Sequence, residues 1–180
     1  MVKKEKGIIV QDYPWYGEAD KGSVLQQGDI LYSCPIVEPT TNVDESKEEL
    51  TADITEYDVI VMSQSCDLAA EKIDLVLLCP FFKLDDIYQE KGTGEKEKLR
   101  RGEVAGLHLL DKNSLLKEAQ DFFVVNFKSV YAVPISYLKK MILVQDKRYR
   151  LLPPYREHLA QAFARFFMRV GLPIDIPEFK

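Results

Sequence analysis

The amino-acid sequence predicts a mainly β protein with few helices. Short runs rich in β-branched and aromatic residues recur along the 180-residue chain, and Gly, Pro or polar clusters separate them. Only one segment, near the C-terminus, places apolar residues at helical spacing between clear start and stop signals. The chain is 46% hydrophobic and 29% charged, which is ordinary for a globular protein of one domain. We therefore expect residues 1–180 to form a single domain.

The predicted strands are short segments that end in proline, glycine or polar residues. They are residues 7–11, 29–36, 58–62, 74–80, 107–110, 122–127 and 130–134. A hairpin of residues 141–144 and 148–152 is expected to follow. The polar stretches 38–56 and 89–103 are expected to be long loops, because both are rich in charged residues.

The predicted C-terminal helix covers residues 155–170. Pro153 and Pro154 precede it, Gly171 ends it, and Pro173 blocks its continuation. It is apolar around most of its girth, so we expect it to be held against a sheet or a partner. A second, short helix is expected over residues 68–72, with Asp67 as its cap.

Charge is unevenly placed along the chain, although the net charge is only −5. Residues 38–56 carry seven acids and one base, and residues 139–169 carry eight bases and two acids. Such asymmetry indicates either a surface for polyanions or a solvated basic face. No apolar run approaches the roughly 20 residues of a membrane-spanning helix, and residues 1–6 do not begin a signal peptide. A cytoplasmic location without membrane contact is expected.

The most informative motif is a polar run directly after the strand at residues 58–62. It consists of Ser63, Gln64, Ser65, Cys66 and Asp67. Loops at the ends of rigid strands often carry sites. Three readings stay open: a thiol nucleophile using Cys66, Asp67 and His158, a polar binding loop, or a turn satisfied by its own side chains.

Two further groups of residues have side chains of the kind that binds ligands or metals. On the C-terminal helix, His158, Arg165 and Arg169 form a narrow polar stripe that can meet phosphates, a partner's acids or only solvent. The three cysteines are scattered, without the close pairs that structural zinc sites use. We therefore expect no disulfide framework, no metal and no cofactor.

The order of these elements resembles the MazF/PemK toxin family. The residues that carry the resemblance are Gly28-Asp29-Ile30, the strand at 59–62 ending in Ser63, the strand 75–80 ending in Cys-Pro, and the segment 122–134. It spans roughly residues 24–170. The resemblance implies an SH3-like barrel over about residues 24–152, with polar loop insertions and the helix 155–170 packed on it.

The chain departs from the family where its ribonucleases have catalytic residues. Residues 55–58 contain no arginine, and residues 71–74 contain no serine or threonine. We therefore expect a non-catalytic, MazF-like interaction or regulatory subunit of a bacterial toxin–antitoxin or antiviral-defence system. Its partner would be another protein or a second copy of the chain, as a homodimer. The alternatives are a cryptic nuclease or Cys66-dependent hydrolase, and a nucleic-acid-binding module using the basic C-terminal third.

Overall fold

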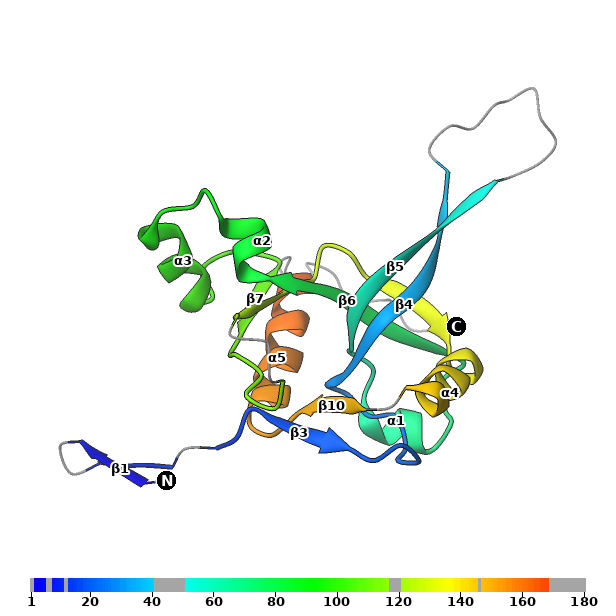
Figure 1. The fold of residues 1–180 in the computed structure, drawn as a ribbon, viewed down its shortest axis with the longest axis horizontal. Coiled ribbons are helices and arrows are strands. Elements are labelled where there is room, and N and C mark those ends of the chain that lie inside the picture. Colours follow the sequence, from blue (N-terminus) through cyan, green and yellow to red (C-terminus); the bar gives the residue numbers. More distant parts are fainter. Residues whose placement is uncertain are drawn as a thin grey trace, which may run out of the picture.

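The chain folds around an open, eight-stranded antiparallel sheet (Figure 1). The computed structural model describes residues 2–5, 8–11, 13–40, 51–116, 121–145 and 147–168. Along the sheet the strand order is β3-β10-β4-β5-β6-β8-β7, and β9 pairs with the first half of β6. In the described chain no ladder joins the end strands β3 and β7, so the sheet is open. The mainly β class is confirmed.

Among the strands of the described residues, three central ones are long and the others are short. The strands are β1 (Val2–Glu5), β2 (Ile8–Gln11), β3 (Tyr16–Ala19), β4 (Asp29–Pro39), β5 (Ala52–Val61), β6 (Leu75–Lys83), β7 (Leu107–Leu110), β8 (Phe123–Asn126), β9 (Tyr131–Pro134) and β10 (Arg148–Leu151). The helices are α1 (Ser65–Ala69), α2 (Leu84–Tyr88), α3 (Thr93–Arg100), α4 (Ile135–Val144) and α5 (Tyr155–Phe167). Strands β1 and β2 form a separate pair.

The sheet has an apolar core on each face, because neighbouring side chains of a strand point in opposite directions. Ile60 of β5 packs in the core beneath α5, which contributes the fully buried Leu159. Val59 and Val61 pack in the opposite core, which Leu138 of α4 completes. The apolar pattern of the sequence predicts one core shared by residues 59–61, residues 75–77 and the phenylalanines of α5, and this prediction is wrong because the sheet separates two cores.

The expected hairpin at residues 141–152 is also wrong. Residues 135–144 form helix α4, whose buried Leu138 and Ile142 lie one turn apart and face the sheet. Strand β10 pairs instead with β3 and β4. An apolar run as short as 141–144 fits a strand or a helix equally well, and packing of the whole segment decides between them.

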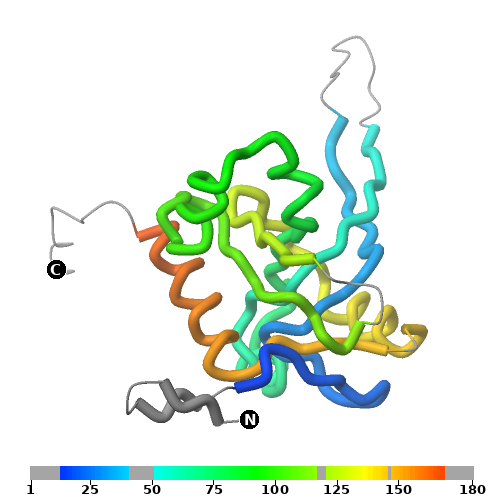
Figure 2. The backbone as a smooth tube through the Cα atoms, turned by 60° about the vertical axis from the view of Figure 1, so that its left-hand side comes forward, coloured from blue at the N-terminus to red at the C-terminus, as the bar shows by residue number. Residues whose placement is uncertain are grey.

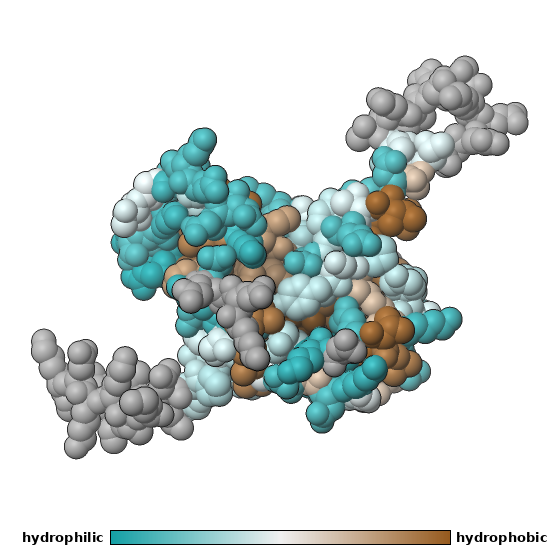
Figure 3. All heavy atoms as spheres, viewed as in Figure 1, coloured by the Kyte–Doolittle hydropathy of each residue, from teal (hydrophilic) through white to brown (hydrophobic). Residues whose placement is uncertain are grey.

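The two expected polar loops contain regular structure. Within residues 89–103 lies α3, where Lys and Glu favour helix and the buried Leu99 anchors it to the sheet. The outer surface of α2 and α3 is hydrophilic (Figure 3). Strands β4 and β5 stay paired as far as Pro39 and Ala52 and form a two-stranded arm (Figure 2). Residues 41–50 lie outside the described residues.

The C-terminal helix is held in place through the strand that precedes it. Asp29 of β4 is fully buried and forms ion pairs with Arg148 and Arg150 of β10. Trp15 stacks on Tyr155, the first residue of α5, with ring centroids 3.6 Å apart. The helix ends at Phe167, and the last part of the predicted segment 155–170 lies outside the described residues. No helix among the described residues is long and apolar enough to cross a membrane.

Candidate functional site

The two serines of the polar motif hold the motif in place. Ser63 is buried, and its Oγ accepts a hydrogen bond of 2.9 Å from the Leu77 N–H of β6. Ser65 Oγ accepts one of 3.1 Å from the Gln27 N–H. The Gln27 side chain, itself buried, donates to the Met62 carbonyl at 2.7 Å. These hydroxyls are therefore engaged with backbone, as in a satisfied turn.

The rest of the motif faces a hollow beside α5. Helix α1 begins at Ser65, not after Asp67 as expected, so Asp67 lies in its first turn. Gln64 and Asp67 line a hollow of about 370 Å³ together with Ser63. The other residues that line it are Gln27, Met62, Ile73, Leu75 and Leu77 of the sheet side, and Ala160, Phe163 and Ala164 of α5.

This hollow continues into a larger and more apolar one along the same helix. The second hollow, of about 860 Å³, shares Leu77, Phe163 and Ala164 with the first. It is further lined by Phe127, Lys128, Val130, Phe166, Phe167 and Met168. We call the two together the α5 groove. Its apolar walls are open to solvent: the exposed fraction is 39% for Leu77 and 59% for Phe167.

Cys66 lies beside the groove and is exposed to solvent. Its thiol donates to Asp67 Oδ1 at 3.8 Å, and this negatively charged neighbour is not the cation that would stabilise a thiolate nucleophile. Cys34 and Cys79 are buried in opposite cores, and burial raises their pKa values to about 11 and 12. Across the described residues, His, Cys, Asp and Glu side chains form no group of three that could hold a metal ion.

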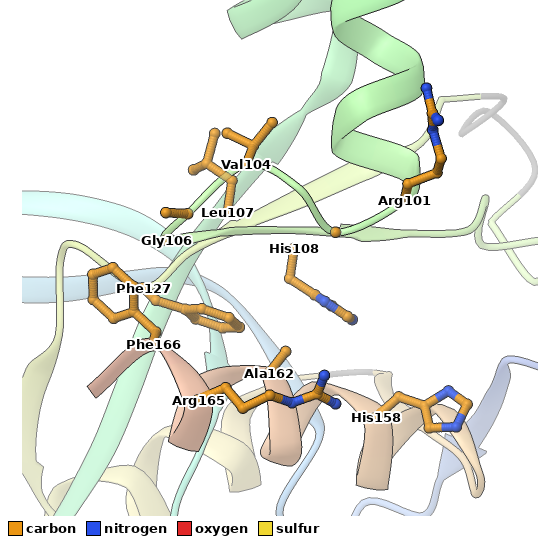
Figure 4. A pocket seen from close by; sticks show the side chains of 12 residues that line it. Arg101, Val104, Gly106, Leu107, His108, Phe127, His158, Ala162, Arg165 and Phe166 are labelled. Carbon is orange, nitrogen blue, oxygen red and sulfur yellow. The ribbon is translucent and has the colours of Figure 1, made fainter. Parts of the chain in front are cut away.

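The predicted polar stripe of the helix lies on a different hollow. His158 and Arg165 line a pocket of about 330 Å³, together with His108 of β7 (Figure 4). Its other lining residues are Arg101, Gly102, Val104, Ala105, Gly106, Leu107, Phe127, Ala162 and Phe166. We call this hollow the cationic pocket. Burial lowers the pKa of His108 to about 4, and the nearby His158 and Arg165 contribute to the shift.

The structure thus divides the predicted site residues into two groups. Ser63, Gln64 and Asp67 line the α5 groove, whereas His158 and Arg165 line the cationic pocket. Arg169 lies outside the described residues. Sequence reasoning missed His108, because nothing local to β7 indicates that this strand approaches α5. No protein-family model, curated protein or solved structure matches this chain.

Proposed function

We propose that the protein is a non-catalytic, MazF-like interaction or regulatory subunit that binds a partner protein in the α5 groove. The proposal includes the SH3-like barrel that the sequence resemblance implies. It also includes a cytoplasmic role in a bacterial toxin–antitoxin or antiviral-defence system. The observation that carries it is that the polar motif at residues 63–67 and a row of exposed apolar side chains line one continuous groove.

The chemistry of the groove defines the segment that it would bind. Its centre is apolar, formed by Leu77 and Phe163, while Asp67 lies at one end and Lys128 at the other. A short amphipathic segment would match these features if its basic group met Asp67, its apolar side chains met Leu77 and Phe163, and its acidic group met Lys128. Aromatic anchors in an apolar groove commonly provide most of the binding energy.

The basic C-terminal third offers less support for an extended polyanion surface. Within the part of the chain that the structure describes, five of its eight basic residues form ion pairs with acids of the same chain. The pairs are Lys139–Glu71, Lys147–Glu18, Arg148–Asp29, Arg150–Asp29 and Arg156–Glu157. Nucleic-acid binding depends on Lys and Arg charges that neutralise phosphates and release their counterions. Ion pairs within the protein already neutralise most of these charges.

The groove is tested by comparing variants during capture of the partner from the native host. Phe167→Asp and Leu77→Asp place a charge in the groove, and we expect each to lose the captured protein. Val144→Asp is the matched control, because Val144 lies on α4 outside the groove and is 78% exposed. It should retain the partner fully.

The affinity for the purified partner then gives the quantitative result. We expect Phe167→Asp to weaken binding at least tenfold, which corresponds to about 1.4 kcal/mol. Circular dichroism must show an unchanged fold for all three variants. A partner that binds Phe167→Asp as tightly as the unmodified protein would refute the assignment of the groove.

A further inference from the structure

The only two histidines of the chain line the same pocket, although they are 50 positions apart. His158 and Arg165 are separated by two helical turns of α5 and lie on one face of it. Ala162 lies between them and leaves space above the helix. Strand β7 brings His108 to the opposite wall, where its imidazole lies across from the Arg165 guanidinium; His158 lines the same pocket, with its ring pointing outward (Figure 4).

The pocket carries positive charge that no lining carboxylate balances. All the described residues that line it are basic, apolar or glycine. Arg165 donates to Gln161 Oε1 at 3.4 Å and has no acidic partner in the described chain. Arg101 turns its guanidinium away from His108 in Figure 4, toward Glu103 at 3.5 Å. The nearest acid on α5, Glu157, is engaged by Arg156 at 2.7 Å.

The other end of the pocket is apolar and contains two aromatic rings. His108 stacks on Phe127 with ring centroids 6.1 Å apart, and Phe166 lies beside Phe127 at 6.3 Å. The pocket of about 330 Å³ is at the small end of the range for ligand sites. A cationic end and an aromatic end in so small a space suit a compact ligand with an anionic head and a flat organic part.

We propose that the cationic pocket is a binding site for a small phosphate ester of the mononucleotide type. The Arg165 guanidinium would hold the phosphate, since a planar guanidinium matches phosphate oxygens in two-point contact. His158, which lines the edge of the pocket, would turn its imidazole toward the bound anion. Phe127 and Phe166 would contact the base. An anion at this place also favours protonation of His108, because opposite charge stabilises the charged form of a histidine.

The two histidines make this proposal measurable by NMR, since each gives its own imidazole C2–H signal. Purified protein is titrated with adenosine 5′-monophosphate and, separately, with inorganic phosphate at constant ionic strength. We expect both histidine signals to shift and saturate, with the nucleotide binding at least tenfold more tightly than phosphate. The variant His158→Gln identifies which signal belongs to His108.

Matched variants separate the pocket from general surface charge. Arg165→Gln should weaken nucleotide binding at least tenfold, whereas Lys140→Gln, which removes an exposed charge on α4, should leave it unchanged. Sulfate, which remains a dianion in mild acid, should raise the pKa of His108 measured by pH titration. A rise in the unmodified protein that is lost in Arg165→Gln supports the site.

Three results would overturn the proposal. They are the absence of saturable shifts, equal weakening in Lys140→Gln, and tighter, steeply salt-dependent binding of an RNA oligonucleotide, which would indicate a polymer surface. A groove variant separates this outcome from that of the α5 groove. Leu77 lines the groove but not the pocket, so Leu77→Asp should bind the nucleotide normally.

Discussion

Replacing Asp29 by asparagine should destabilise the protein strongly. Asp29 is fully buried, and its carboxylate accepts a hydrogen bond of 2.9 Å from the Gln26 N–H. The same carboxylate pairs with Arg148 at 3.1 Å and with both Nε and Nη2 of Arg150. Asparagine has nearly the same shape but no charge, so two guanidinium groups, exposed by only 2% and 15%, would lose their counterion.

The magnitude follows from the burial of this cluster. Removing one member of a buried ion pair costs about 3–5 kcal/mol, because the remaining charge is left without compensation. For a chain of this size each kcal/mol lowers the melting temperature by about 2–4 °C. The expected loss for Asp29→Asn is therefore about 6–20 °C.

Differential scanning calorimetry and urea unfolding followed by circular dichroism measure this loss. Glu71→Gln is the control, because it also removes a carboxylate from an ion pair, that with Lys139, but the pair lies on the surface. It should leave the melting temperature unchanged within error, since exposed pairs contribute little. If Asp29→Asn melts within 2 °C of the unmodified protein, the cluster does not hold β4 to β10 in the way described.

Four further outcomes are expected. Ser63→Ala removes the acceptor of the partly buried hydrogen bond from the Leu77 N–H and should cost about 0.5–1.5 kcal/mol in urea unfolding; a neutral result would mean that the Ser63 hydroxyl is dispensable. Gly106→Ala should destabilise, because φ is +82° there and an added Cβ would lie 2.9 Å from the ring of Phe166; equal melting temperatures would contradict this. His108 has a folded pKa of about 4, below its ordinary value of about 6.5, so the unfolded chain binds more protons between these values. Stability should fall as the pH decreases through this window and fall less in His108→Gln, as calorimetry at several pH values would show. Under the proposed MazF-like function, incubation with long single-stranded RNA should show no cleavage, because residues 55–58 contain no arginine and residues 71–74 contain no serine or threonine; specific cleavage lost on mutating the protein would refute this.

The β class and the C-terminal helix could be predicted because both depend on local patterns. The predicted central strands at residues 58–62 and 74–80 contain the continuous apolar runs 59–62 and 75–80, and residues 153–171 contain complete start and stop signals. The class of residues 141–144 could not be predicted, because it depends on Leu138 and Ile142 meeting a sheet face built from distant strands. Strand β3 was missed because four residues that include Gly17 carry too little pattern.

The candidate site was only partly accessible to sequence reasoning for a related reason. The motif at residues 63–67 could be singled out by its composition, but the roles of its serines depend on Gln27 and Leu77, which approach from other elements. Which residues lie near His158 depends on the position of β7 in the sheet, and no local periodicity of the sequence indicates that position. Contacts between segments far apart in the sequence decide which polar side chains form hydrogen bonds within the fold and which can bind a ligand.

The stacking of Trp15 on Tyr155 gives the protein an intrinsic fluorescence probe of α5. Trp15 is the only tryptophan of the chain, and its carbonyl accepts a 2.8 Å hydrogen bond from the Leu152 N–H just before α5. The indole ring of Trp15 therefore lies at the N-terminal end of α5, where the segment before β3 contacts the C-terminal third of the chain. The fluorescence emission of Trp15 should change when α5 moves away from the sheet, so that the rate of this motion can be measured without attaching a dye.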